Sequence, residues 1–191
     1  MKPLSLLAQI RSIGFDDAPF PRERRTRVGL VGVVCSGTRF EGMVYGRIQK
    51  DGWDATATIE SLLLGGKFLP QLHLVLLDGL TFGGFNVVDL PRLAERLGVP
   101  CTSVMRRAPD LAAIERALQR LPRSRQRLSL LQRAGPVYQR GGFTFQVQGG
   151  DPADIAAALA RLTDRGRVPE PLRLAHLIGS AIETGESSRR A

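Results

Sequence analysis

Apolar residues fall into short runs that predict strands and into longer periodic segments that predict helices. The first quarter of the chain is rich in Val, Ile, Phe and Tyr and is interrupted by Gly, a pattern typical of consecutive strands joined by tight turns. We expect these strands at 10–15, 28–36 and 39–48. Strands and helices then alternate, with helices at 55–64 and 88–97 and strands at 72–77 and 99–105. This alternation predicts parallel pairing among the later strands.

The last third of the chain predicts helices around one hairpin. The Arg-rich segment 120–133 predicts a helix, or a helix with a loop, whose leucines face inward. Residues 137–147 predict a hairpin that turns at 140–142, and closing helices are expected at 153–163 and 170–183. These elements predict a mixed α/β sheet flanked by helices. With 191 residues, we expect a single domain spanning 1–191, with a frayed tail from about residue 185.

The charge of the chain favours a polyanionic partner. The sequence has 27 basic and 18 acidic residues, a formal net charge of +9, and most of the excess follows residue 95. A basic surface of this kind favours the binding of nucleic acid. No apolar stretch approaches the roughly 20 residues of a membrane helix, and the N-terminus lacks a signal-peptide pattern. We therefore expect a cytoplasmic protein without a membrane partner.

Several classes of chemistry are disfavoured. Two Cys and two His are too few for a zinc cluster, and His73 and His176 are expected to pack or cap. Neither the dinucleotide-binding glycine pattern nor the P-loop occurs in the sequence.

Carboxylates follow two of the predicted strands. Asp16 and Asp17 come directly after the first strand, and Asp78 ends the apolar run 72–77. If these strands are parallel neighbours, the acidic side chains emerge at one sheet edge, where ligand sites form. Asp54, in the loop before the first helix, would approach the same edge. Each could be only a cap or turn residue, but acidic residues that end buried strands are costly unless a cation binds.

Five segments in order carry a resemblance to a known family: 13–20, 51–56, 77–86, 99–107 and 169–176. Together they are similar to the endonuclease dU family, a mainly archaeal relative of endonuclease V, nearly from end to end. The resemblance implies a ribonuclease-H-like fold whose first three strands are antiparallel. It also implies a metal-dependent endonuclease that cleaves a DNA phosphodiester near a deaminated base, with deoxyuridine as the lesion.

The same resemblance implies the metal site. Asp16, Asp54 and Asp78 would hold Mg²⁺ or Mn²⁺, with Asp17 as a neighbour and an alternative to Asp16. Glu60 is the weaker alternative to Asp54. Arg106 stands where endonuclease V has a Lys that helps at the phosphate. Because Arg does not readily give up a proton at neutral pH, its expected role is electrostatic.

Substrate contacts are expected in the glycine-rich loop 79–86 and at basic positions. Enzymes that act on a damaged base generally extrude it into a pocket, where Gly permits close approach and aromatic rings stack. We expect Phe82 or Phe85 to form this pocket with Gly79 and Gly83, and Trp53 to wedge into the gap.

Arg107, Arg173 and the 120–133 segment would hold the DNA backbone. Three alternatives stay open: the aromatic residues could belong to the core, the protein could bind nucleic acid without cleaving it, or it could be a nuclease directed at RNA.

Overall fold

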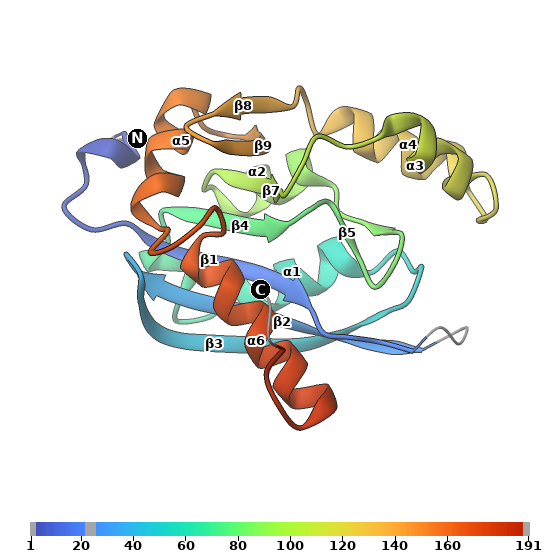
Figure 1. Ribbon diagram of the computed structural model, residues 1–191, viewed down its shortest axis with the longest axis horizontal. Coiled ribbons are helices and arrows are strands. Elements are labelled where there is room, and N and C mark those ends of the chain that lie inside the picture. The colour runs from blue at the N-terminus through green and yellow to red at the C-terminus, as the bar shows by residue number, and fades with distance from the viewer. Residues whose placement is uncertain (1–2, 22–25, 189–191) are drawn as a thin grey trace.

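A computed structural model describes residues 3–21 and 26–188 (Figure 1). The strands of the main sheet are β1 (Arg11–Asp17), β2 (Arg27–Ser36), β3 (Arg39–Gln49), β4 (Leu74–Asp78), β7 (Cys101–Met105), β8 (Tyr138–Arg140) and β9 (Phe143–Gln148). A separate short ribbon pairs β5 (Thr81–Phe82) with β6 (Asn86–Val87). The α-helices are α1 (Ala55–Leu63), α2 (Leu90–Leu97), α3 (Leu111–Leu118), α4 (Ser124–Arg133), α5 (Pro152–Arg161) and α6 (Glu170–Thr184).

The main sheet is mixed, in the order β3-β2-β1-β4-β7-β9-β8. The first three strands pair antiparallel, with a turn at Gly37 (φ +60°) between β2 and β3. β4 pairs parallel with both β1 and β7, and the β8–β9 hairpin closes the far edge antiparallel. The structure therefore confirms the expected antiparallel start and the parallel centre of the sheet.

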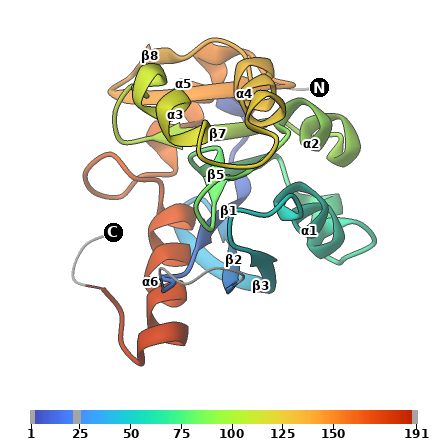
Figure 2. The ribbon, with the colours of Figure 1, turned by 90° about the vertical axis from the view of Figure 1, so that its right-hand side faces the viewer.

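Side-chain alternation along the strands divides the core into two layers. Ile13 and Phe15 of β1 and Leu77 of β4 face one side and pack with α1 and α2. Leu74 and Leu76 face the other side, which α5 and α6 cover. Figure 2 shows the two helix pairs on opposite sides of the sheet.

Close contact between α6 and β1 depends on Gly14. A Cβ atom at this position would lie 2.6 Å from the carbonyl carbon of Pro171. The absence of a side chain at Gly14 therefore lets the start of α6 lie directly on β1, beside the carboxyl end of that strand.

Helix boundaries follow the capping residues. Asp89 accepts from the N–H of Arg92 at the start of α2, and Gly98 ends that helix in the left-handed conformation. α6 ends at Thr184, but the Glu186 carbonyl accepts hydrogen bonds from the side chains of Ser180 and Thr184. The chain thus remains against the helix beyond residue 185, and only the end of the expected frayed tail, 189–191, lies outside the described residues. None of the described helices is long and apolar enough to cross a membrane.

The region 111–133 contains the helix with a loop that was expected at 120–133, together with α3, which the sequence reasoning missed. It holds two helices, because the chain turns after α3 and Arg123 takes a left-handed conformation (φ 56°) before α4. Leu128 and Leu131 are only partly buried, whereas Arg127 is buried. The expected inward leucines are therefore only partly buried, and the side chain of this segment that is fully buried is Arg127.

Candidate active site

Asp16 and Asp78 lie side by side at the carboxyl ends of the two central parallel strands. Phe15 pairs with Leu77, so the next residue of each strand is an aspartate on the face that α6 covers. The Asp16 residue is only 4% exposed. The strand register thus brings together two carboxylates that the sequence separates by about sixty residues.

His176 of α6 completes this cluster from the neighbouring layer. Its Nδ1 atom lies 2.9 Å from Oδ2 of Asp16, and His176 also lowers the pKa of Asp78. The Oδ1 atom of Asp16 accepts from the N–H of Asp17 at 2.8 Å. The expectation that His176 only packs or caps is therefore wrong. The sequence feature that could have pointed to His176 is its position in the segment 169–176, one of the five segments that carry the family resemblance.

Burial and mutual repulsion make the carboxylates hard to ionise. Burial, with contributions from Asp78 and Asp17, raises the pKa of Asp16 to about 8. Burial also raises the pKa of Asp78 and of Asp17, although Arg106 opposes the rise at Asp78. Arg106 is exposed directly after β7 and acts on Asp16 as well. The carboxyl ends of β1 and β4, which form the carboxylate edge, therefore favour the binding of a cation.

Asp17 points to the opposite face of β1. Its Oδ2 atom accepts from the N–H of Gly83 at 2.7 Å, which ties the loop 79–86 to the end of the strand. Of the two adjacent aspartates, Asp16 faces Asp78, and Asp17 holds the loop.

Asp54 is engaged elsewhere. Its Oδ1 atom accepts from the side chain of Asn86 at 2.6 Å, and both of its oxygens accept from the N–H of Gln49. The carboxylates that raise the pKa of Asp16 are Asp78 and Asp17, not Asp54. Asp54 therefore fixes the loop before α1 and is not brought into the Asp16–Asp78 pair.

Glu60 is also engaged away from that edge. It is buried on α1 and receives two hydrogen bonds from Arg92 of α2, at 2.9 and 2.8 Å. This ion pair joins the two helices.

The donor set at the edge fits a hard divalent cation. Within residues 3–21 and 26–188, no group of three or more His, Cys, Asp or Glu side chains is arranged as a ready metal site. Asp16 and Asp78 nevertheless offer carboxylate oxygens, the ligands that Mg²⁺ prefers and that Mn²⁺ accepts. The burial of Asp16 beside the carboxylate of Asp78 supports the fit, because a bound cation would offset both the burial of charge and the repulsion between the two groups.

A cavity of about 1000 Å³ adjoins this edge. Gly79, directly after Asp78, and Arg107, directly after Arg106, border it, and α3 and α4 form its outer wall. Two of the expected substrate-binding residues therefore line this cavity, whereas Asp16, Asp78 and Arg106 are not among its lining residues.

The aromatic residues of the expected pocket occupy different environments. Phe82 is completely buried in the core with Val88 and Leu90, so the expectation that it lines an open pocket is wrong. Phe85 is partly buried, and Gly83 is held through its backbone by Asp17. Trp53 is 40% exposed, and its ring lies against Arg127.

Arg173 lies on α6, one turn before His176. It forms an ion pair with Glu170 at 2.8 Å, and 38% of its side chain is exposed. The charges that act on Arg173 are those of Glu170, Asp164 and Cys35, and Cys35 pairs with Ser12 toward the amino end of β1. The structure therefore does not bring Arg173 to Asp16 and Asp78, although part of its side chain is open to solvent.

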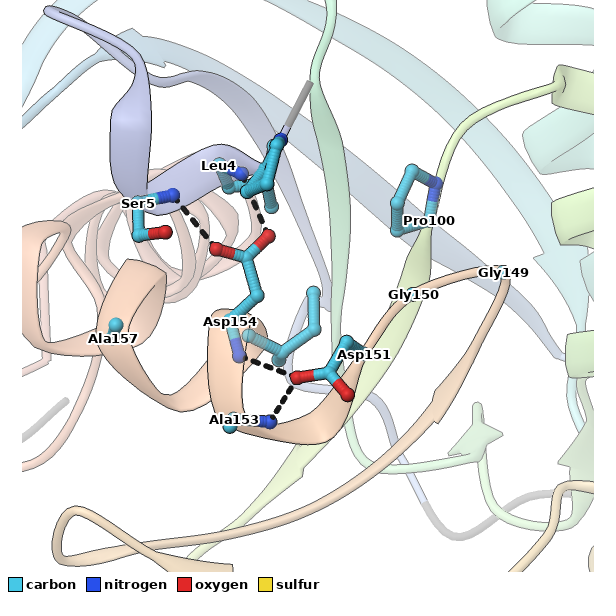
Figure 3. A pocket seen from close by; sticks show the side chains of 11 residues that line it. Leu4, Ser5, Pro100, Gly149, Gly150, Asp151, Ala153, Asp154 and Ala157 are labelled. Carbon is cyan, nitrogen blue, oxygen red and sulfur yellow. Dashed lines mark hydrogen bonds between the residues drawn. The ribbon is translucent and has the colours of Figure 1, made fainter. Parts of the chain in front are cut away.

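A second cavity, of about 550 Å³, lies at the other end of the sheet, where β7 begins (Figure 3). Its acidic residues are already satisfied. Asp154 accepts from the N–H groups of Leu4 and Ser5, and Asp151 caps α5. Asp154 therefore holds the N-terminal segment on α5 and Asp151 begins that helix, so the carboxylates of this cavity have structural roles.

The mixed sheet, its helices and its strand order define an endonuclease V-like fold. Endonuclease V from Bacillus subtilis superimposes with a TM-score of 0.58 at 13% identity, covering 92% of this chain and 81% of that one. Endonuclease V from Ciona intestinalis, in complex with a DNA containing an inosine followed by a ribo-adenosine, gives 0.54 at 15% identity, covering 89% and 84%. These likenesses show the fold.

Within that fold, the chain belongs to the endonuclease dU family, whose model matches residues 8–183. A UPF0215 protein of Methanothermobacter thermautotrophicus is 41% identical over 94% of this chain and 91% of its own length. One from Deinococcus radiodurans is 40% identical over 93% and 91%. A protein of unknown function from Archaeoglobus fulgidus has a TM-score of 0.85 at 34% identity, covering 91% of this chain and 98% of that one.

Proposed function

We propose that this protein is a metal-dependent endonuclease that cleaves a DNA phosphodiester near a deaminated base, with deoxyuridine as the lesion. The observation that carries the proposal is the pairing of the buried Asp16 with the partly buried Asp78 at the ends of adjacent parallel strands. Membership of the endonuclease dU family supports the nuclease activity, and the family name supports the lesion.

In this proposal, Asp16 and Asp78 hold Mg²⁺ or Mn²⁺. When bound, the ion supplies a Lewis acid that lowers the pKa of a water molecule and offsets charge on the leaving oxygen. His176 fixes the orientation of the Asp16 carboxylate through its 2.9 Å contact. Asp17 keeps the loop 79–86 in place, and Asp54 keeps the loop that carries Trp53 in place.

The phosphate contacts come from basic residues around the edge. Arg106 places a permanent positive charge near both carboxylates and is suited to offset charge on the scissile phosphate. Arg107 borders the cavity, and the exposed arginines of α3 and α4 extend the basic surface. Arg173, farther along α6, would contact the DNA backbone away from the carboxylates. Such contacts position the backbone and carry no sequence preference.

The cavity bordered by Gly79 and Arg107 is suited to receive an extruded base. A flipped base needs a pocket next to the cleavage centre, and a neighbouring side chain that fills the vacated stack lowers the cost of extrusion. Trp53 is an exposed aromatic residue that could take the second task, since 40% of it is open to solvent. It lines a separate cavity of about 360 Å³, together with Gln126 and Ser129 of α4.

A substrate panel tests this function. End-labelled single strands and duplexes containing uracil, hypoxanthine or no lesion, and matched ribose strands, would be incubated with the protein in Mg²⁺, Mn²⁺ or EDTA. We expect metal-dependent nicking of the uracil strand, with intact strands cleaved much more slowly.

Other outcomes identify the alternatives. Preferential cleavage of the ribose strands would identify an RNA-directed nuclease. Salt-sensitive binding of every strand without any cleavage would identify a non-catalytic nucleic-acid-binding protein, because phosphate contacts alone give binding that weakens as salt rises.

A further inference from the structure

Arg127 of α4 is buried in a way that sets it apart from the other arginines of that helix. Only 1% of it is exposed, whereas Arg123 and Arg125 are exposed. Burying a guanidinium group is costly unless its donors are satisfied, and burial lowers the pKa of Arg127. A buried arginine in the basic region 111–133 therefore has a task other than contacting phosphate.

The donors of Arg127 are directed at backbone carbonyls of two loops. Its Nη2 atom donates to the carbonyl of Asp51 at 2.6 Å, and its Nη1 atom donates to those of Gly52, at 3.1 Å, and Phe85. These carbonyls belong to the loop before α1 and to the loop between β5 and β6. A planar guanidinium with several fixed donors can join both loops at once, which the single ammonium group of Lys cannot do with the same geometry.

The same guanidinium covers the ring of Trp53. Its central carbon lies 4.3 Å from the ring centroid, within the range of a cation–π interaction. The guanidinium carbon of Arg123 lies 5.7 Å from this ring, but that residue is exposed. Arg127 thus fixes both the backbone next to Trp53 and the ring itself.

A continuous set of hydrogen bonds connects this contact with the carboxylate edge. Asp17 accepts from the N–H of Gly83 at 2.7 Å, and the carbonyl of Gly83 accepts from the N–H of Asp51 at 2.8 Å. The carbonyl of Asp51 accepts in turn from Arg127. The position of Trp53 is therefore coupled through rigid polar contacts to the strand that ends in Asp16 and Asp17.

We infer that Arg127 is a positioning residue that holds the indole of Trp53 in one orientation relative to the carboxylate edge, so that the ring meets the nucleic acid at a fixed place. The structural part of this inference stands on the contacts of Arg127. Its consequence for cleavage rests on the proposed function.

The experiment uses the fact that Trp53 is the only tryptophan in the chain, so fluorescence excited at a wavelength that Tyr does not absorb reports on this ring alone. Arg127→Lys keeps the charge but removes the fork of donors. We expect its emission to shift to the red and acrylamide to quench it more strongly than the wild type. Arg125→Lys makes the same substitution at an exposed site on the same helix, and its emission should match that of the wild type.

Kinetics on the uracil strand then separate positioning from binding. We expect Arg127→Lys to lower kcat by roughly tenfold or more with KM little changed, because a displacement of about 1 Å can cost up to about a hundredfold in rate. A loss of kcat without any change in emission or quenching would overturn the inference, since Arg127 would then act on the substrate directly.

A measurement on the wild type keeps the inference testable even if Arg127→Lys does not fold. The anisotropy decay of Trp53 should contain no fast rotation of the ring independent of the whole protein, and such a rotation would overturn the inference. If the wild type cleaves none of the strands, the proposed function fails, but the fluorescence results still decide whether Arg127 positions Trp53.

Discussion

The Nδ1 atom of His176 lies 2.9 Å from Oδ2 of Asp16, although 160 residues separate them in the sequence. The contact joins α6 to the end of β1 at the point where Asp78 ends the neighbouring strand. The tight packing of α6 on Gly14 brings the helix close enough for this contact. The carboxylate edge is thus built jointly by the sheet and the last helix.

Replacing His176 with Ala is expected to reduce cleavage and Mn²⁺ affinity by about 10- to 100-fold, because loss of a residue that orients a metal ligand typically costs this much. The cleavage rate as a function of Mn²⁺ concentration, with calorimetric titration of the ion, measures the effect. His73→Ala is the matched control, since His73 accepts from the N–H of Arg11 at the opposite end of β1. Equal losses in both variants would argue against a role for His176 at the edge.

The raised pKa of Asp16 predicts how stability depends on pH in EDTA. The folded protein keeps the Asp16 proton up to about pH 8, whereas an unfolded Asp loses its proton near about pH 4. The folded state therefore binds more protons in between, so this group makes the free energy of unfolding fall as pH rises through that interval.

Urea denaturation at several pH values measures this slope. Asp16→Asn should make the slope shallower, and saturating Mn²⁺ should stabilise the wild type more at high pH than at low pH. If Asp16→Asn left the slope unchanged, the buried carboxyl would not be the group responsible.

Phe82 and Trp53 are expected to respond differently to replacement with Ala. Phe82 is completely buried, so Phe82→Ala should lower the free energy of unfolding by about 3–5 kcal/mol through the cavity it leaves. Trp53→Ala should destabilise much less and should reduce the preference for the uracil strand. Denaturation curves and relative cleavage of uracil and intact strands separate the two effects. An unchanged preference in Trp53→Ala would remove its role as a wedge.

Arg106 is expected to act through its charge. Arg106→Gln should lower the cleavage rate and reduce the salt slope of DNA binding by about one phosphate contact, whereas Arg106→Lys should preserve most of the slope. Binding measured over a range of salt concentrations tests this. An unchanged slope in Arg106→Gln would show that the side chain does not contact the backbone.

The sequence was sufficient to predict the sheet and its acidic edge. Strand alternation and apolar runs locate β1 and β4, and both strands end in aspartates, so Asp16 and Asp78 could be placed together before any packing was known. The helix expected at 88–97 corresponds to α2, whose ends are capped by Asp89 and Gly98 through local backbone geometry.

Contacts between layers could not be predicted in this way. His176 reaches Asp16 only because α6 packs on β1, and nothing local in the helix indicates that contact. From the sequence, Arg127 would be predicted to lie on the surface. In the structure it is buried, and backbone carbonyls of two distant loops accept hydrogen bonds from its guanidinium group. Asp54 was expected to be a third metal ligand because it precedes the first helix. In the structure, its carboxylate accepts a hydrogen bond from the side-chain amide of Asn86. Each difference arises from partners that are remote in sequence.

The most direct test of the central claim compares Asp78→Asn with Asp54→Asn in metal-dependent cleavage of a uracil-containing strand. Both substitutions keep the shape of the side chain and remove its charge. The wild type should nick the strand in Mg²⁺ or Mn²⁺, Asp78→Asn should lose this activity, and Asp54→Asn should keep a substantial part of it. Undiminished cleavage by folded Asp78→Asn would contradict the claim that Asp16 and Asp78 form the catalytic metal site.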